Sequence, residues 1–190
     1  GINAYSDGRI ASLGTVILVA FLICHFTLSI FTKYKDDHEK EVLYKLAYSD
    51  ELTKLYNRRY CERIMDELTE KQQHYTIFSF DLNNLKKIND SMGHQYGDAL
   101  ISGFANILKD TFSEDAVVGR MGGDEFIVLL DDKDIHSHDH SKEIKKYYEI
   151  LERYNRQEEN FQFSASYGYA DMEEIQPVDG VVDSRKVYAL

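Results

Sequence analysis

The sequence has few of the residues that cross-link small domains or build long linkers. It contains two cysteines, one proline and no tryptophan among 190 residues. Cys24 lies in an apolar run and Cys61 in a polar, helix-like pattern, so a disulfide framework is not expected. A single proline argues against a long disordered linker. Fourteen tyrosines and ten phenylalanines supply material for a hydrophobic core.

Positive charge is also scarce, with 22 basic residues against 33 acidic ones and a net charge of −11. Non-specific nucleic-acid binding depends on Lys and Arg side chains that neutralise phosphates, so no nucleic-acid partner is expected. A nucleotide substrate stays possible, because a bound metal ion can supply the positive charge. Gly-x-Ser-x-Gly, Walker and Rossmann patterns are all absent, which disfavours hydrolases and P-loop proteins.

One long segment has no charge at all. Residues 10–31 contain no Asp, Glu, Lys or Arg, and as a helix of about 1.5 Å per residue they match the roughly 30 Å of a bilayer core. The sequence therefore predicts a transmembrane helix over residues 10–32, with a buried core helix as the alternative. One basic residue precedes this segment closely and four follow it: Arg9, then Lys33, Lys35, Lys40 and Lys45. The positive-inside rule then predicts a single-pass anchor in the cytoplasmic membrane, with the rest of the chain in the cytoplasm.

We expect different roles for the regions on either side of this segment. The chain begins at Gly1 rather than Met, so residues 1–9 are expected to be the end of a longer upstream region. Residues 33–48 are charged and carry apolar side chains at helical spacing, namely Val42, Leu43, Leu46 and Ala47. They are either a solvated helical connector or a stalk that pairs with a second copy.

The remaining residues, 49–190, predict an α+β domain. Ser49-Asp50 offers helix-capping chemistry before the first helix. The periodicities predict helices over 58–73, 98–108 and 142–155, strands over 76–82 and 161–170, and a hairpin over 116–130. This order suggests helices packed on one face of a mostly antiparallel sheet.

The tip of the hairpin is the most informative feature. Gly122-Gly123 joins two β-rich runs, and glycine tolerates the positive φ that tight hairpin turns demand. Asp124 and Glu125 follow directly, so both carboxylates are expected at a fixed, exposed position. Glycines without side chains also let a ligand approach the backbone. The turn therefore predicts a site for a divalent cation and a phosphate.

Asp81 is the expected partner of this turn. It ends an apolar strand, and a buried unpaired carboxylate is too costly to lack a cation or a hydrogen-bond partner. If the hairpin lies beside residues 76–82, Asp81 and Asp124 meet across the sheet, and two carboxylates with phosphate oxygens and waters suit Mg²⁺. The alternative is that Asp81 caps the helix that follows.

Residues 83–98 are dense in polar groups suited to a nucleotide. Lys86 or Lys87 can meet a phosphate, while Asn89 and Asp98 can read a purine edge. That pair suits guanine, which presents N–H donors, although turn and capping roles remain open. His136, His138 and His140 alternate along a loop, but their polar surroundings and the lack of nearby cysteines predict a solvated loop rather than a metal site.

These segments together resemble one family, the GGDEF-domain diguanylate cyclases. The resemblance covers residues 47–190 and rests on four motifs. They are Asp50-x-Leu52-Thr53-x-Leu55-x-Asn57-Arg58-Arg59, the polar segment from Phe80 to Asp98, the Gly122–Phe126 turn, and Ser166-Tyr167-Gly168. It implies a palm-like sheet flanked by helices, as in the nucleotidyl cyclases.

The resemblance also implies a reaction, the condensation of two GTP into cyclic di-GMP with release of two pyrophosphates. Each subunit would hold one GTP, so a homodimer is required. Mg²⁺ or Mn²⁺ would be bound by Asp81, Asp124, Glu125 and the Leu82 carbonyl, with Asp81, Asp124 and Glu125 as the catalytic set. GTP would contact seven positions: Leu85, Lys86, Asn89, His94, Asp98, Gly122 and Gly123.

Four departures from the family pattern qualify these expectations. Asn83 stands where many members carry a second Asp, and Leu85 where Phe is common. Ser113 and Ala116 occupy the positions of the Arg-x-x-Asp product-inhibition motif, so feedback inhibition through that site is not expected. The chain also stops before the family's last helix, so it is expected to lack that helix. The competing hypotheses are a GGDEF module that binds GTP without turnover and regulates a partner, and a purely structural membrane-tethered module.

Overall fold

The computed structural model describes residues 2–131 and 140–171, in two compact units, residues 1–47 and 48–190. The first unit is formed by α1 (Ile2–Tyr48), a continuous helix with no break between the predicted span and the predicted stalk. Its side chains from residue 18 to residue 46 are exposed. Within the described residues, Leu18–Tyr48 is the helical stretch long and apolar enough to cross a membrane, a test that a signal sequence also passes.

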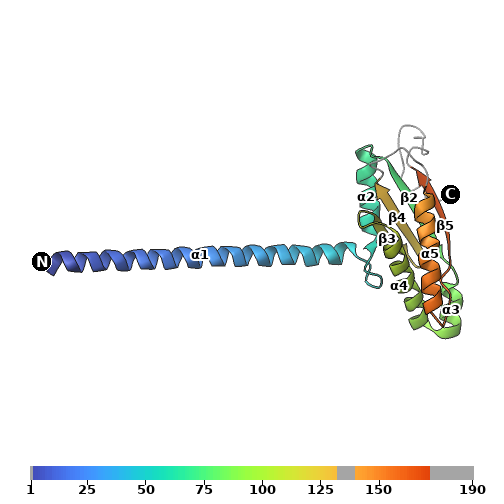
Figure 1. The fold of residues 1–190 in the computed structure, drawn as a ribbon, viewed down its shortest axis with the longest axis horizontal. Coiled ribbons are helices and arrows are strands. Elements are labelled where there is room, and N and C mark those ends of the chain that lie inside the picture. The colour runs from blue at the N-terminus through green and yellow to red at the C-terminus, as the bar shows by residue number, and fades with distance from the viewer. Residues whose placement is uncertain (1, 132–139, 172–190) are drawn as a thin grey trace. The chain divides into compact units, whose positions relative to one another are not determined.

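The second unit is built on a five-stranded sheet with the order β1-β3-β4-β2-β5 (Figure 1). The strands are β1 (Tyr56–Asn57), β2 (Tyr75–Leu82), β3 (Val117–Gly122), β4 (Glu125–Asp131) and β5 (Ala165–Asp171). The β1–β3 pair is parallel and the other three pairs are antiparallel. The predicted α+β sheet is therefore confirmed, with β2 lying between β4 and β5.

Four helices accompany the sheet: α2 (Arg58–Glu70), α3 (Leu85–Met92), α4 (His94–Thr111) and α5 (Ser141–Gln157). The prediction missed α3 and started α4 four residues late, at Asp98. Both errors fall in the polar 83–98 segment, where only Ile88 and Gly97 are buried and the apolar signal is weak. The N-cap of α2 is Asn57, whose side chain accepts a hydrogen bond from the Tyr60 amide, so Asp50 is not a helix cap.

Helices cover both faces of the sheet, so the expectation of one covered face is wrong. Phe78, Phe80 and Leu82 of β2 pack in the cluster that contains the buried side chains of α4 and α5. Tyr75 and Ile77 face the other way, toward Cys61 and Met65 of α2. A strand buried on both faces is apolar at nearly every position, and its sequence does not reveal which helix covers which face.

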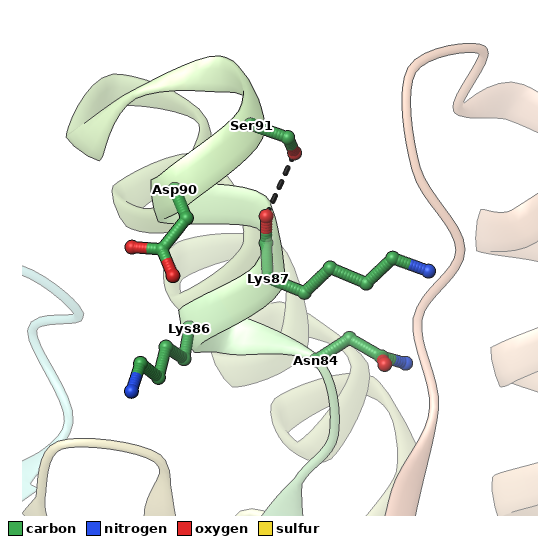
Figure 2. A pocket seen from close by; sticks show the side chains of 5 residues that line it. All are labelled: Asn84, Lys86, Lys87, Asp90 and Ser91. Atoms are coloured by element: carbon green, nitrogen blue, oxygen red, sulfur yellow. Dashed lines mark hydrogen bonds between the residues drawn. The ribbon is translucent and has the colours of Figure 1, made fainter.

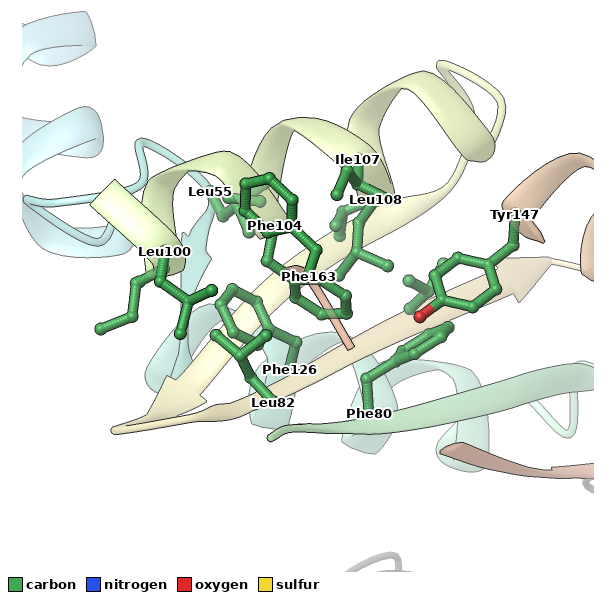
Figure 3. Packing of buried hydrophobic residues seen from close by; sticks show 14 of the residues in the cluster. Leu55, Phe80, Leu82, Leu100, Phe104, Ile107, Leu108, Phe126, Tyr147 and Phe163 are labelled. Atoms are coloured by element: carbon green, nitrogen blue, oxygen red, sulfur yellow. The ribbon is translucent and has the colours of Figure 1, made fainter. Parts of the chain in front are cut away.

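The α4 face holds the larger core. Figure 3 shows Leu100, Phe104, Ile107 and Leu108 of α4 packed against Phe80, Leu82 and Phe126 from two strands. Phe161 and Phe163 also enter this core, although they lie before β5 rather than in the strand predicted over 161–170. This core fixes the β2–β4 pair beneath α4, and so fixes the end of the sheet where the acidic residues lie.

We expect Phe104→Ala to lower the free energy of unfolding by about 3–5 kcal/mol, since it empties a fully buried aromatic position. Urea unfolding followed by circular dichroism measures the change. Tyr148→Ala is the matched control, because Tyr148 is 52% exposed and should cost much less. A loss at Phe104 no larger than that at Tyr148 would contradict the packing described.

Candidate active site

The hairpin turn has the backbone that its glycines predict. Gly122 has φ 146° and Gly123 has φ 53°, both in the region that favours glycine. A Cβ atom at either position would meet nothing within 4 Å, so backbone conformation rather than crowding requires glycine here. The β3–β4 register shifts between Arg120 and Gly122, which pairs Gly122 with Glu125. The space beside both glycines of the turn is therefore open.

Strand pairing brings the three acidic residues to one end of the sheet. Asp81 of β2 is the direct antiparallel partner of Glu125 of β4. The Leu82 amide donates to the Asp124 carbonyl at 2.9 Å, which ties the turn to the end of β2. Asp81 and Glu125 are exposed and Asp124 is half-buried. Among the described residues, none of these three carboxylates has a hydrogen-bond or ion-pair partner.

The expectation that Asp81 is buried is wrong. The burial pattern of β2 changes near its end, where Ser79 and Asp81 are exposed. Both lie on the face that α2 covers, but the α2 cluster includes only Tyr75 and Ile77 from this strand. Asp81 therefore projects beyond the reach of α2 and stays open to solvent. Openness suits a residue that must receive a ligand.

The donor set suits a hard cation only in part. Within residues 2–131 and 140–171, no three His, Cys, Asp or Glu side chains gather closely enough to hold a metal ion by themselves. Mg²⁺ in nucleotide sites is usually bound by one or two carboxylates, with phosphates and waters completing its shell. Asp81 and Asp124 supply two carboxylates, and the backbone hydrogen bond from Leu82 to Asp124 holds the segments that carry them side by side.

Asn89 of α3 lies against Gly97 of α4, the residue before Asp98. A Cβ atom at Gly97 would lie 2.0 Å from Asn89 Oδ1, so only glycine lets the Asn89 side chain take this position. That oxygen is buried and has no hydrogen-bond partner among the described residues. Asp98, the next residue, is exposed. A ligand with N–H donors would satisfy an acceptor that the protein leaves unpaired.

The other predicted nucleotide contacts lie around α3. A shallow pocket of about 600 Å³ is lined by Asn84, Lys86, Lys87, Asp90 and Ser91. In Figure 2, Lys86 and Asp90 project from one side of α3, whereas Lys87 and Asn84 project from the other. Leu85 is half-buried against the core and His94 is exposed at the start of α4. Lys86 is thus free to reach a phosphate, while Leu85 is mainly a packing residue.

The structure reveals a network around Arg120 that the sequence did not indicate. Arg120 donates from Nε and Nη2 to the Gly123 carbonyl, at 3.0 and 2.8 Å. Its Nη1 lies 3.3 Å from both carboxylate oxygens of Asp50. Asp50 Oδ1 also accepts from the amide and hydroxyl of Thr53, at 2.8 and 2.7 Å. The sequence carries no signal that joins two residues 70 positions apart.

Asn83 also has a defined structural role. Its side-chain Nδ2 donates to Ser164 Oγ at 3.0 Å, and its backbone N–H donates to the Ser164 carbonyl at 2.8 Å. The Ser166 hydroxyl donates to Asn83 Oδ1 at 3.5 Å. The residue that departs from the family pattern therefore fastens the loop after β2 to the start of β5.

The prediction for the histidine cluster is wrong at His140, and His136 and His138 lie outside the described residues. His140 is buried before α5, with Nε2 3.1 Å from Asp171 Oδ1 and 3.3 Å from Thr76 Oγ1. The Thr76 hydroxyl donates to the same Asp171 oxygen at 2.5 Å. His140 thus fastens the beginning of α5 to β2 and β5, and its partners are too distant in sequence to have been foreseen.

Comparison with known proteins agrees with the fold. The family model described as diguanylate cyclase, GGDEF domain, matches residues 47–182. This match covers more than half of the 190 residues. The chain belongs to the family of GGDEF-domain diguanylate cyclases.

Individual relatives support this membership. A probable diguanylate cyclase of Escherichia coli, DgcT, is 30% identical over 132 residues, 68% of this chain and 27% of that protein. A diguanylate cyclase of Vibrio cholerae is 33% identical over 108 residues, 55% of this chain and 34% of that protein. The chain therefore spans about a third or less of these two relatives.

A solved structure shares the fold. The coiled coil and GGDEF domain of DgcB from Caulobacter crescentus, in complex with c-di-GMP, superposes with a TM-score of 0.61 and 22% identity. The match covers 79% of this chain and 82% of that one.

The Asp50 carboxylate makes a pH-dependent contribution to stability. Burial would raise its pKa, but the hydrogen bonds from Thr53 and the charge of Arg120 outweigh burial and lower the pKa. A lowered pKa stabilises the folded state above the ordinary Asp value of about 4, and this stabilisation disappears as the pH falls through the folded pKa. We therefore expect Asp50→Asn to be less stable than wild type at pH 7, with the difference shrinking below about pH 4.

Urea titrations of both proteins at several pH values measure this difference. The exposed Asp115, changed to Asn, serves as the control and should show no such dependence. A difference for Asp50→Asn that is equally large at pH 7 and pH 3 would show that the Asp50 charge is not involved.

Proposed function

We propose that this chain is a diguanylate cyclase, which condenses two GTP into cyclic di-GMP with release of two pyrophosphates. The observation that carries this proposal is the β2–β4 pairing, which sets Asp81 opposite Glu125 and hydrogen-bonds Leu82 to Asp124. Membership of the GGDEF family supplies the substrate class and the product.

The acidic end of the sheet is proposed to hold the reacting groups. Asp81, Asp124 and the Leu82 carbonyl would bind Mg²⁺ or Mn²⁺, and Glu125 would support that site or accept the proton of the attacking 3′-hydroxyl. When bound, such an ion would lower the pKa of that hydroxyl and neutralise charge that develops on the phosphate. The exposed backbone of the Gly122–Gly123 turn would approach the triphosphate, and Lys86 would approach it from α3.

The guanine base of GTP would be recognised away from the acidic end of the sheet. The unpaired Asn89 Oδ1 and the exposed Asp98 carboxylate are acceptors for the N1–H and N2–H₂ groups of guanine. His94, exposed at the start of α4, is close in sequence to this pair.

One subunit would hold one GTP, so turnover requires two subunits that face each other. The exposed apolar residues near the end of α1 support such pairing, since Val42, Leu43 and Leu46 are 43%, 64% and 72% exposed.

Residues 10–32 are proposed to anchor the chain in the cytoplasmic membrane, and Leu18–Tyr48 satisfies the length and composition that a span requires. The domain of residues 49–190 would then act in the cytoplasm as the output of a membrane sensor.

The first test removes the Asp124 carboxylate. We expect Asp124→Ala to lower turnover by about 10²–10³-fold, the scale seen when one group that stabilises developing charge is removed. The melting temperature should stay close to wild type, because the carboxylate has no partner among the described residues. Chromatographic detection of cyclic di-GMP measures turnover, and Asp115→Ala is a matched control at an exposed acidic residue. Unchanged turnover in Asp124→Ala would remove Asp124 from the mechanism.

The second test targets guanine recognition. Gly97→Ala places a methyl group where Asn89 Oδ1 now lies, so the Asn89 side chain must turn away. We expect KM for GTP to rise by roughly tenfold, on the order of one lost hydrogen bond to the base. Gly168→Ala is the control, because a Cβ there meets nothing within 4 Å. Equal KM values in the two variants would argue against guanine binding at Asn89.

A further inference from the structure

The turn that carries Asp124 is held by hydrogen bonds at two consecutive carbonyl oxygens. Arg120 binds the Gly123 carbonyl from one side, through Nε and Nη2. The Leu82 amide binds the Asp124 carbonyl from the other side. The peptide groups on both sides of the Asp124 Cα atom are therefore fixed, although the two preceding residues are glycines with intrinsically mobile backbones.

Arg120 performs this task without occupying the acids beside it. Its ion pair is with Asp50, and within the described residues neither Asp124 nor Glu125 is paired with it. The side chain is only 14% exposed, so it is enclosed rather than free to move through solvent. A guanidinium group is planar and presents several N–H donors at fixed angles, which lets it bind a carbonyl and a carboxylate at once.

Asp50 holds the Arg120 side chain at Nη1, the guanidinium nitrogen that does not contact the turn. Two hydrogen bonds from Thr53 fix Oδ1, and both carboxylate oxygens face Arg120 Nη1. Asp50 lies two residues after Tyr48, the last residue of α1. A single guanidinium group thus connects the first residues of the domain to the turn.

We propose that Arg120 is a positioning residue of the GTP site: it fixes the Gly122–Asp124 turn through the Gly123 carbonyl, and Asp50 fixes the orientation of Arg120. The effect on turnover rests on the proposed diguanylate cyclase function, whereas the effect on the turn does not. The inference concerns geometry, because Arg120 contacts the turn through the Gly123 carbonyl and, among the described residues, is not paired with Asp124 or Glu125. A shift in the Asp50–Thr53 segment would reach Asp124 through this one side chain.

The first experiment observes the turn directly and needs no substrate. The full chain, labelled with ¹⁵N-glycine and held in detergent micelles, is compared with Arg120→Gln by NMR. We expect the Gly122 and Gly123 amide signals to broaden or move toward random-coil positions in this variant. Arg153→Gln is the matched control, because Arg153 pairs with Asp110 at 2.8 Å away from the turn. Unchanged Gly122 and Gly123 signals in Arg120→Gln would overturn the inference, whatever the enzyme's activity.

The second experiment measures turnover. Misplacement of a reacting group by about 1 Å can cost about 100-fold in rate. We expect kcat to fall roughly 10–100-fold in Arg120→Gln while KM for GTP changes by less than about threefold. Arg120→Lys should recover only part of this loss, because an ammonium group lacks the planar, multiple N–H donors that bind the Gly123 carbonyl and the Asp50 carboxylate together. Arg153→Gln should retain wild-type kcat.

A double-mutant cycle tests the role of Asp50. If Asp50 acts through Arg120, Asp50→Asn should lower kcat in the wild-type background and have little further effect in Arg120→Gln. Fully additive losses would separate Asp50 from the turn. If wild type makes no cyclic di-GMP, the proposed function fails, and the NMR comparison alone still decides whether Arg120 positions the turn.

Discussion

The antiparallel pairing of β2 with β4 is the constraint on which the rest of the structure depends. Its register places Asp81 opposite Glu125, and one further hydrogen bond, from Leu82 to Asp124, fixes the turn beside the strand end. A slip of one residue would send Asp81 to the opposite face, because side chains alternate along a strand. The two apolar faces of β2, packed under α2 on one side and under α4 and α5 on the other, oppose such a slip.

The site is assembled from segments that are stabilised separately. The sheet end carries the acids, the α3–α4 contact at Gly97 carries the polar pair Asn89 and Asp98, and Arg120 links the turn to Asp50. The carboxylates of Asp81, Asp124 and Glu125 and the Asn89 Oδ1 atom have no partner among the described residues, while Arg120 and the strand pairing hold the backbone beside the acids. This combination of fixed backbone and free polar atoms is typical of a binding site, since buried polar atoms are otherwise satisfied within the protein.

Local patterns predicted much of this domain. The Gly-Gly turn, its two flanking strands and the strand that ends in Asp81 follow from glycine conformation and alternating apolar residues, and the structure confirms them. Three features depend on distant partners and were missed: the position of α2 on the second face of the sheet, the burial of His140 against Asp171, and the Asp50–Arg120 pair. The α3 helix was missed for a different reason, because its short sequence has a single buried residue, Ile88.

The central claim is that the acidic end of the sheet makes a phosphodiester product from GTP. The most direct measurement is to incubate the full chain with GTP and Mg²⁺, under conditions that favour dimers, and to quantify cyclic di-GMP and pyrophosphate. The account predicts two pyrophosphates for each cyclic di-GMP, with turnover lost on removal of the divalent ion. GTP binding without any product, even when dimers are enforced, would contradict the account and favour a regulatory GTP-binding module.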